Sequence, residues 1–414
     1  MLTWPLPYAQ ALHAAEFITG PPMIKGIPLW RAAGIQAVRL LTDLFLDLVA
    51  RHGEPTVLQH GFLADAAAGR QVFGAYDNVY DVRDLPGHRG VQFRSDNIVT
   101  VVTGWSRAAQ RGPVVSIGEV IRDAPGKTPP LFRDRSIWPV VELNHIVAAA
   151  DAESLLTAYA TIVEDLLAAI GIPTVTVRTP ALAGYGKLSY LTVAVLPNKR
   201  PTVLATLYVL TDELRSALGV EQDVIDVGFT GKILATTAML HADARGLVLP
   251  SAIAPTQVGV TLPPEHGADD WLSRLRAGGL RCDVVVAGQA AGRDRAERAW
   301  HRRGVPLVIG LGRAREAVAV CTRLPMARVE LPELPEPQQV RDLLAAADAR
   351  LATRATAVFE SGMAEGGHLR SVCGSCSRDL AVFGAVVPGV AGHCDTCGGP
   401  AGEQLFVSDE GRFY

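Results

Sequence analysis

The chain has 414 residues, a formal net charge of −3, 49% hydrophobic residues and 20% charged residues. These values exclude general disorder, and the length suggests two or three domains, each with its own core. The near-neutral charge does not by itself indicate nucleic-acid binding, although a local basic face is compatible with it. No stretch approaches the roughly 18 apolar residues of a membrane span, and no basic leader precedes an apolar core. We therefore expect a cytoplasmic protein without membrane contact.

The first half of the chain alternates between helical and strand-like patterns. Residues 33–51 and 151–171 place apolar side chains at the spacing of amphipathic helices. Asp151 is placed to cap the start of the second helix and Gly171 to end it. Strand-like runs surround this second helix, and the turn signal at 196–201 favours antiparallel pairing between neighbours. The predicted strands cover residues 113–121, 174–178, 188–196 and 202–210.

The order of predicted helices and strands changes near residues 261–270, which indicates a domain boundary. Beyond it, helix and strand patterns alternate over about 60 residues, as is typical of a small α/β domain with parallel strands. A proline-rich linker at 331–337 then leads into a helix near 338–361 and a cysteine-bearing tail. We therefore predict three domains, over residues 1–262, 263–335 and 336–414.

Four cysteines in the tail form the strongest spacing signal in the sequence. Two C-x2-C knuckles, Cys373/Cys376 and Cys394/Cys397, suit a tetrahedral site with four thiolates, for which zinc is the expected ion. Four protein ligands leave no open position, so the zinc would be structural. Two disulfides or four unrelated cysteines are the alternatives. We expect the nearby His393 to be solvated rather than a ligand.

The two remaining cysteines, Cys282 and Cys321, lie on predicted strands. Their placement favours buried, inert thiols.

Three segments resemble the class II prolyl-tRNA synthetase family of the archaeal and eukaryotic type. HADARGLVLPSAIAPTQVGV (241–260) resembles the segment after that family's third motif, and GVPLVIGLGRAREAVAVCTR (304–323) is similar to its anticodon-binding domain. The tail, with CDTCGGP and a terminal Tyr414, resembles the family's zinc-bearing extension. The resemblance implies an α+β catalytic domain built on an antiparallel sheet, an α/β anticodon-binding-like domain and a small zinc domain. It also implies a homodimer, in which residues 25–34 would form part of the interface.

The resemblance also implies which residues handle ATP with Mg²⁺. Arg122 falls where the family has its α-phosphate arginine, and Lys232 falls where it has an arginine for the γ-phosphate. Lysine keeps the charge but loses the bidentate fork. Arg133 and Arg135 remain phosphate candidates, and Thr206 aligns with a family threonine. The acidic residue expected near the adenine is replaced by Ala124.

The amino-acid pocket departs from the family at several positions. Tyr208 replaces a histidine, and the loop expected to carry a Thr-x-Glu pair reads FRSDNIV (93–99), where Asp96 could hold an ammonium group. Beyond Trp138, Glu142 and His145 are candidate counterparts of family residues at altered spacing. These changes predict a surviving cavity with altered polar partners.

Three functions are compatible with this pattern. The first is a paralogue that activates some other carboxylic or amino acid as an adenylate, for example in specialised metabolism. The second is a divergent, genuine proline–tRNA ligase. The basic helix at 292–304, with Arg281 just upstream, suits contact with tRNA phosphates, and a solvated helix face is the alternative. The third is a non-catalytic scaffold or regulator that resembles a synthetase.

Overall fold

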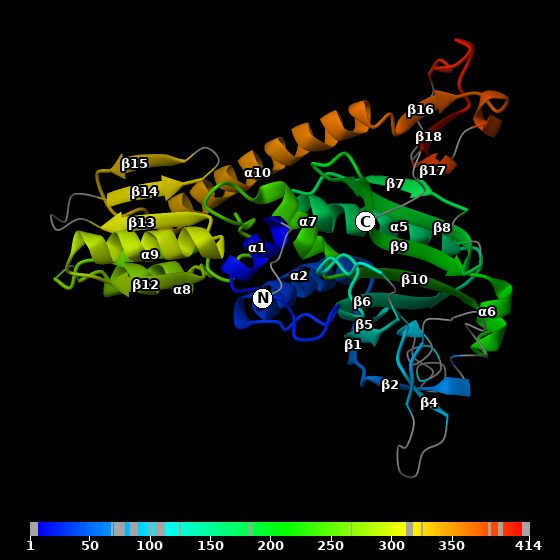
Figure 1. The fold of residues 1–414 in the computed structure, drawn as a ribbon, viewed down its shortest axis with the longest axis horizontal. Helices are drawn as coiled ribbons and strands as arrows, with labels where there is room; N and C mark the ends of the chain where they lie inside the picture. The colour runs from blue at the N-terminus through cyan, green and yellow to red at the C-terminus, as the bar shows by residue number, and fades with distance from the viewer. Residues whose placement is uncertain are drawn as a thin grey trace.

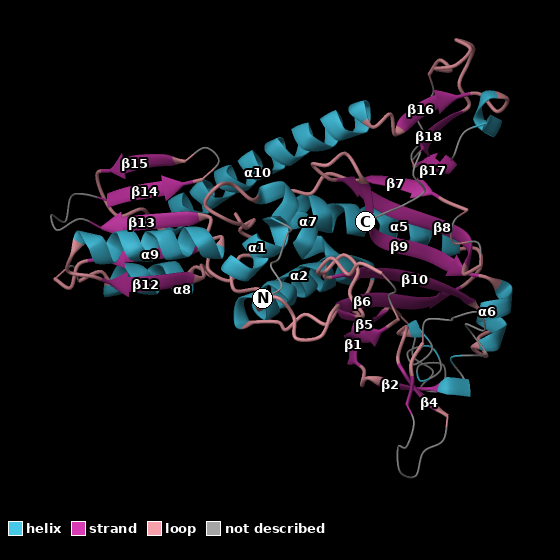
Figure 2. Ribbon diagram, in the orientation of Figure 1, coloured by secondary structure: helices cyan, strands magenta, loops and turns pink. Residues whose placement is uncertain are grey.

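The computed structural model describes residues 7–67, 69, 79–82, 90–98, 102, 104, 112–123, 126–180, 182, 184–265, 267–311, 318–323, 326–379, 382–387 and 392–407. Its main feature is a ten-stranded sheet with the order β1-β5-β6-β10-β9-β8-β7-β17-β18-β16 (Figures 1 and 2). These strands are β1 (Thr56–Gln59), β5 (Val114–Ile121), β6 (Ser136–Val147), β7 (Val175–Arg178), β8 (Gly186–Val195), β9 (Pro201–Leu210), β10 (Asp223–Thr230), β16 (Leu369–Val372), β17 (Val382–Val386) and β18 (Glu403–Val407).

The sheet is antiparallel except at one edge, where β1 pairs with β5 in parallel. The predicted antiparallel sheet is thus confirmed. Successive side chains on a strand point to opposite faces, and this sheet uses its two faces differently. On β10, Ile225, Val227 and Phe229 join the main hydrophobic core. The residues between them face the other side of the sheet.

Helices cover the core face of the sheet. They are α1 (Pro7–Ala14), α2 (Ala32–Val49), η1 (Ala50–His52), α5 (Ala152–Ala169) and α7 (Lys232–His241). Leu41 and Phe45 of α2 pack with Leu156 and Val163 of α5 in that core, as the apolar spacing predicts. Asp151 does precede α5, but its side chain makes no capping hydrogen bond.

A second, five-stranded sheet has the order β12-β11-β13-β14-β15. Its elements are β11 (Val258–Leu262), α8 (Asp269–Ala277), β12 (Cys282–Val286), α9 (Ala290–Arg303), β13 (Leu307–Leu311), β14 (Val318–Thr322) and β15 (Ala327–Leu331). Only β12, β11 and β13 run parallel, while β14 and β15 are antiparallel to their neighbours. The expected parallel sheet is therefore mixed. β11 pairs with β12 and β13 of this sheet. The predicted domain boundary after residue 262 would place β11 in the first domain instead. That boundary remains a prediction.

A buried arginine connects the two sheets. Arg323, which follows β14, donates hydrogen bonds to the carbonyls of Leu247 (2.8 Å) and His301 (2.6 Å) and forms an ion pair with Asp243. Its side chain is 1% exposed. Because Asp243 and Leu247 follow α7, this cluster fixes the second sheet to the segment that ends α7.

The C-terminal segment returns to the large sheet. The long helix α10 (Pro337–Glu365) runs from the five-stranded sheet past α7 to the C-terminal strands (Figure 1). There β17 pairs with β7, so the cysteine-bearing segment, including η2 (Cys376–Asp379), continues the sheet of the first half.

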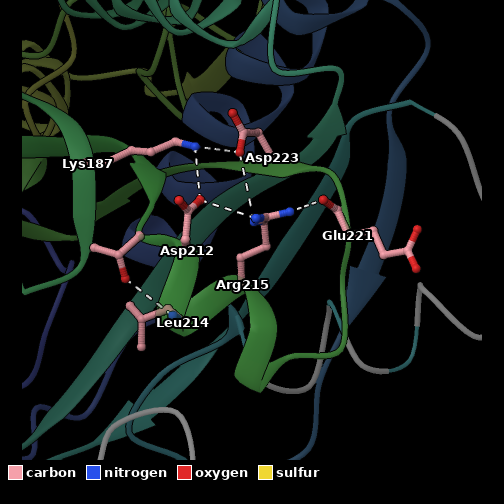
Figure 3. Close-up of polar contacts among 7 residues, drawn as sticks. Lys187, Asp212, Leu214, Arg215, Glu221 and Asp223 are labelled. Carbon is pink, nitrogen blue, oxygen red and sulfur yellow. Dashed lines mark hydrogen bonds and ion pairs between the residues drawn. The ribbon is translucent and has the colours of Figure 1, made fainter.

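Two smaller elements complete the described fold. A three-stranded sheet is formed by β2 (Leu63–Asp65), β4 (Val91–Phe93) and β3 (Asp81–Val82). The short helix α6 (Asp212–Ala217) begins where Thr211 Oγ1 accepts a hydrogen bond from the Leu214 backbone (Figure 3). Among the helices of the described residues, none is both long and apolar enough to cross a bilayer.

Candidate active site

A cavity of about 310 Å³ lies on the sheet face opposite the helices. Strands β5, β6, β9 and β10 form its floor, and the start of α7 closes one end. The structure brings seven of the predicted site residues to this cavity: Asp96, Arg122, Trp138, Glu142, Thr206, Tyr208 and Lys232.

The register of the strands explains why these residues meet. Glu142 on β6 lies opposite Gly228 on β10, which in turn lies opposite Thr206 on β9. In the next row, Asp226 lies opposite Tyr208. Gly228 has no side chain, and a Cβ there would lie 3.9 Å from Thr206 Oγ1 and 4.0 Å from Glu142 Cγ. The floor is therefore open between Glu142 and Thr206.

One end of the cavity carries positive charge. Arg122 Nε donates to the Ser95 carbonyl at 2.7 Å, and its Nη2 lies 3.5 Å from Asp96 Oδ2. Lys232 is the first residue of α7, and burial lowers its pKa to about 8. The amino-terminal end of a helix attracts anions, so Lys232 and the helix favour negative charge at the same place.

Arg133 and Arg135 do not line the cavity. Arg133 is exposed to solvent. Arg135 is half-buried, and its backbone bonds to Gly26 and Arg122 on either side. Arg135 thus lies next to Arg122 through the backbone, but neither arginine lines the cavity with Arg122 and Lys232.

His145 is also outside the cavity, and its placement corrects our prediction. It lies three residues from Glu142 on β6, and this odd separation turns it to the helix-covered face. There its Nδ1 lies 2.8 Å from the Tyr159 hydroxyl, and burial lowers the pKa of the imidazole. Of the two candidates that follow Trp138 in the sequence, Glu142 and His145, only Glu142 therefore lines the cavity.

Sequence reasoning missed Asp226, which lies beside Glu142 in the cavity. Asp226 Oδ2 accepts a hydrogen bond from Asn144 Nδ2 at 2.8 Å. Burial and the nearby Asp96 raise the pKa of Asp226 to about 8, and burial, Asp226 and Asp96 raise the pKa of Glu142 well above its usual range. Adjacent buried carboxyls cannot both ionise readily, so this pair holds at least one proton at neutral pH. The available signal was an aspartate in the middle of β10, between the apolar residues Ile225 and Val227.

Asp134, between the two loop arginines, is a second missed residue of the cavity. Its Oδ2 accepts the backbone N–H of Leu131 at 2.8 Å. Burial raises the pKa of this carboxyl to about 7. Four carboxyl side chains therefore line a cavity whose lining includes two cations, Arg122 and Lys232.

The four tail cysteines meet in the geometry of a metal site. Their sulfur atoms all lie within 4.8 Å of one another, and those of Cys373 and Cys397 are 3.8 Å apart. Tetrahedral Zn–S bonds of about 2.3 Å imply sulfur separations of about 3.8 Å. Each knuckle closes a tight turn, with Cys376 N donating to Cys373 O and Gly398 N donating to Cys394 O. The cluster can therefore hold a metal ion, and none of the four cysteines is in a disulfide.

The remaining sequence expectations have simple outcomes. His393 is exposed and is not part of the sulfur cluster. Cys321 is buried as expected, whereas Cys282 is only half-buried. Ala124 and Tyr414 lie outside the described residues.

Arg281 does not belong to the basic surface around α9. Its guanidinium donates to the carbonyls of Ser251 (2.6 Å) and Ala254 (2.8 Å). The guanidinium of Arg281 is therefore hydrogen-bonded to backbone carbonyls within the chain.

Comparison with known proteins identifies relatives of one kind. No protein-family profile matches the chain. Among curated proteins, the proline–tRNA ligase of Methanopyrus kandleri is 25% identical over 392 residues, which cover 86% of this chain and 80% of the relative. That of Methanosarcina mazei is 23% identical over 343 residues, covering 74% and 70%.

Solved structures share the fold over nearly the whole chain. The Giardia lamblia prolyl-tRNA synthetase in complex with prolyl-adenylate superposes with a TM-score of 0.81 at 16% identity, covering 99% of this chain and 97% of the other. The Cryptosporidium parvum enzyme complexed with halofuginone and AMPPNP gives 0.80 at 17%, covering 98% and 97%. Together with the sequence matches, this makes the chain a divergent relative of the class II prolyl-tRNA synthetases.

Proposed function

We propose that the chain is an ATP-dependent ligase that converts a small carboxylic or amino acid into its adenylate. The observation that carries the proposal is the polarity of the cavity, with Arg122 and Lys232 at one end and buried carboxyls on the floor. The relatives are named as proline–tRNA ligases, and one structural neighbour was solved with prolyl-adenylate. A cavity of this kind suits a substrate that bears both charges.

The reaction places specific demands on these residues. A carboxylate oxygen of the substrate attacks the α-phosphorus of ATP, the new O–P bond forms, and the bond to the β-phosphate breaks to release pyrophosphate. Arg122 would stabilise the negative charge that develops on the α-phosphate, and Lys232 would hold the departing phosphates. Mg²⁺ would enter bound to ATP and neutralise part of its charge. Trp138 and Tyr208 would shape the substrate pocket.

The altered pocket favours an acid other than proline as the substrate. Glu142 and Asp226 form a buried carboxyl pair in the floor, and a small apolar imino acid offers nothing that would pair with both groups. A divergent proline–tRNA ligase is the second candidate. It is favoured by sequence similarity that extends over 86% of the chain and by the exposed Arg295, Arg298, Arg302 and Arg303 on α9.

ATP–pyrophosphate exchange across a panel of amino acids and other carboxylic acids tests the proposal. Exchange with a non-proline acid, at a rate above that with proline, is the expected result. Exchange with proline alone, together with charging of tRNA, would establish the second candidate. Absence of exchange with every acid, and of ATP binding, would favour a non-catalytic scaffold instead.

We further propose that the four-cysteine cluster holds structural zinc. Four thiolates in a closed tetrahedron match the ligand preference of this ion. Elemental analysis of the purified protein should find about one zinc per chain, and Cys394→Ser should lower this content. Protein that is fully folded and contains no metal would contradict the proposal.

Dimerisation is the remaining partner proposal. Apolar side chains of Met23, Ile24 and Leu29 are exposed beside and within residues 25–34. Such a group of exposed apolar residues is typical of an interface. Sedimentation equilibrium should therefore give twice the mass of one chain.

A further inference from the structure

Glu142 has a feature that adenylate formation alone does not explain. Its side chain lines the cavity and is 6% exposed, yet its Oε1 has no hydrogen-bond partner. A buried carboxyl oxygen without a partner is costly in the empty protein. Because Glu142 borders the open floor above Gly228, a ligand in the cavity would lie beside this carboxyl group.

Among the described residues, no cationic side chain forms an ion pair with Glu142 or Asp226, although the charge of Arg94 acts on Glu142. Arg94 is the closest candidate, but its Nη2 donates to the Glu119 carbonyl at 2.9 Å, and its Nε and Nη1 have no hydrogen-bond partner. Arg122 is held by Ser95 and Asp96. The groups that bond to Asp226 are the neutral side chains of Asn144 and Tyr208, besides Glu142 itself.

The carboxyl groups are arranged in sequence along the cavity. Asp96 lies 3.5 Å from Arg122, at the cationic end. Asp226 lies four residues along β10 from Thr230, which lines the cavity at the Lys232 end. At about 3.3 Å per residue, this separation is about 13 Å along the strand. Asp226 thus lies away from the Lys232 end, while Asp96 lies beside Arg122 and acts on the pair through its charge.

We propose that the activated acid is an amino acid with a second, side-chain cation, which the Glu142–Asp226 pair binds. The inference rests on the proposed adenylate formation, because it assigns the substrate class of that same site. The carboxylate of the substrate lies at the Arg122 end and its α-ammonium at Asp96. The α-ammonium is only two bonds from the carboxyl carbon and would occupy Asp96, so the Glu142–Asp226 pair is left for a group at the end of the side chain.

Binding changes the state of the pair. An incoming ammonium group donates a hydrogen bond to the unpartnered Glu142 Oε1, and its charge favours the ionised forms of both carboxyls. Tyr208 and Asn144 keep Asp226 oriented, and Asp96 and Arg94 are the other charged groups whose fields reach the pair. A neutral side chain of the same length would supply no charge to favour the ionised carboxyls.

The test compares L-ornithine with L-norvaline, which has the same carbon chain without the side-chain amine, and with L-proline. ATP–pyrophosphate exchange measures activation, and calorimetric titration without ATP measures binding alone. We expect a kcat/KM at least about 10-fold higher for ornithine than for norvaline. In Asp226→Asn and Glu142→Gln, ornithine should lose about 10- to 100-fold, and the preference for ornithine over norvaline should fall by the same factor. Asp212→Asn, in a solvent-exposed ion cluster, is the matched control and should leave both substrates unchanged (Figure 3).

The outcomes separate the two proposals. Exchange with proline or norvaline at or above the level with ornithine would overturn the substrate assignment and leave adenylate formation in place. Ornithine binding that Asp226→Asn weakens, without exchange, would support the assignment and overturn adenylate formation. Neither binding nor exchange would overturn both. Norvaline exchange and the thermal midpoint of each variant show that it is folded.

Discussion

Strand β10 carries two buried aspartates only three residues apart, Asp223 and Asp226, and their bonding partners differ in charge. Asp223 accepts from Lys187 Nζ at 2.7 Å and lies 4.0 Å from Arg215 Nε, within a cluster that also includes Asp212 (Figure 3). Asp226 has an amide, a phenol and another carboxyl as its partners. The first aspartate is paired with cations of the chain itself, and the second is not.

This difference separates a structural charge from a charge kept for a ligand. A buried carboxylate with its own cations stabilises the fold, because removing it would leave those cations without a partner. A buried carboxyl without a cation lowers stability and is retained for chemistry. The two lysines divide in the same way, since Lys187 belongs to the ion cluster and Lys232 to the cavity.

The largest expected effect is the loss of exchange activity when Lys232 is replaced, compared with the same replacement at Lys187. Lys232→Met should lower ATP–pyrophosphate exchange about 100- to 1,000-fold, because it removes a preorganised cation from the phosphate end. Lys187→Met should keep full exchange. Since the pKa of Lys232 is about 8, kcat/KM for ATP should fall as pH rises through 8 and its charge is lost. Equal losses in the two variants would remove the distinction between the regions.

The next effect concerns the structural aspartate. Asp223→Asn should lower the free energy of unfolding by about 2 kcal/mol, because Lys187 and Arg215 lose their buried partner. Urea unfolding followed by circular dichroism measures this change. Exchange activity of the folded variant should equal that of the wild type. A variant that is as stable as the wild type but less active would contradict this assignment.

Asp226→Asn should act in the opposite direction on stability. The pKa of Asp226 is raised from 3.8 to about 8 in the folded protein, so the folded state holds a proton that the unfolded state releases above pH 4. Its contribution to stability is therefore present at low pH and is lost as pH rises through 8. The variant should gain on the wild type as pH rises from 4 to 8, by several kcal/mol at most, since each pKa unit corresponds to about 1.4 kcal/mol. Urea unfolding at pH 5 and pH 8 measures it, and a gain at the lower pH would contradict the assignment.

The smallest effect is expected for Asp212. Lys187 lowers the pKa of this exposed carboxyl, so its contribution is present above its unfolded pKa of 3.8 and is lost as pH falls below that value. Asp212→Asn should therefore cause a slight decrease in thermal midpoint at pH 7 and none at pH 3. The same slight decrease at both pH values would show that the ion pair is not its cause.

Much of the fold was predictable because its signals are local. The apolar spacing of residues 33–51 and 151–171 predicted α2 and α5, and the turn at 196–201 predicted the pairing of β8 with β9. The mixed second sheet was not predictable in the same way. Whether β14 runs parallel or antiparallel to β13 depends on long-range pairing that the pattern of either strand does not encode.

The site was predictable only where resemblance and register agree. Arg122 and Lys232, which the resemblance predicted as phosphate-binding residues, line the cavity, whereas His145, also predicted, lies on the opposite face of β6. The resemblance did not predict Asp226, because it indicates only residues that have a counterpart in the family. An aspartate at an even position of β10, in line with Gly228 and Thr230, is the pattern that indicates it.

The pairing of β17 with β7 has a consequence for the integrity of the whole molecule. If the chain ended before residue 369, β7 would present unpaired backbone N–H and C=O groups along an open edge of the large sheet. Open edges recruit strands from other molecules and lead to aggregation. The cysteine-bearing segment thus covers the edge of the sheet that holds the cavity. The first expected effect of its removal is a loss of solubility.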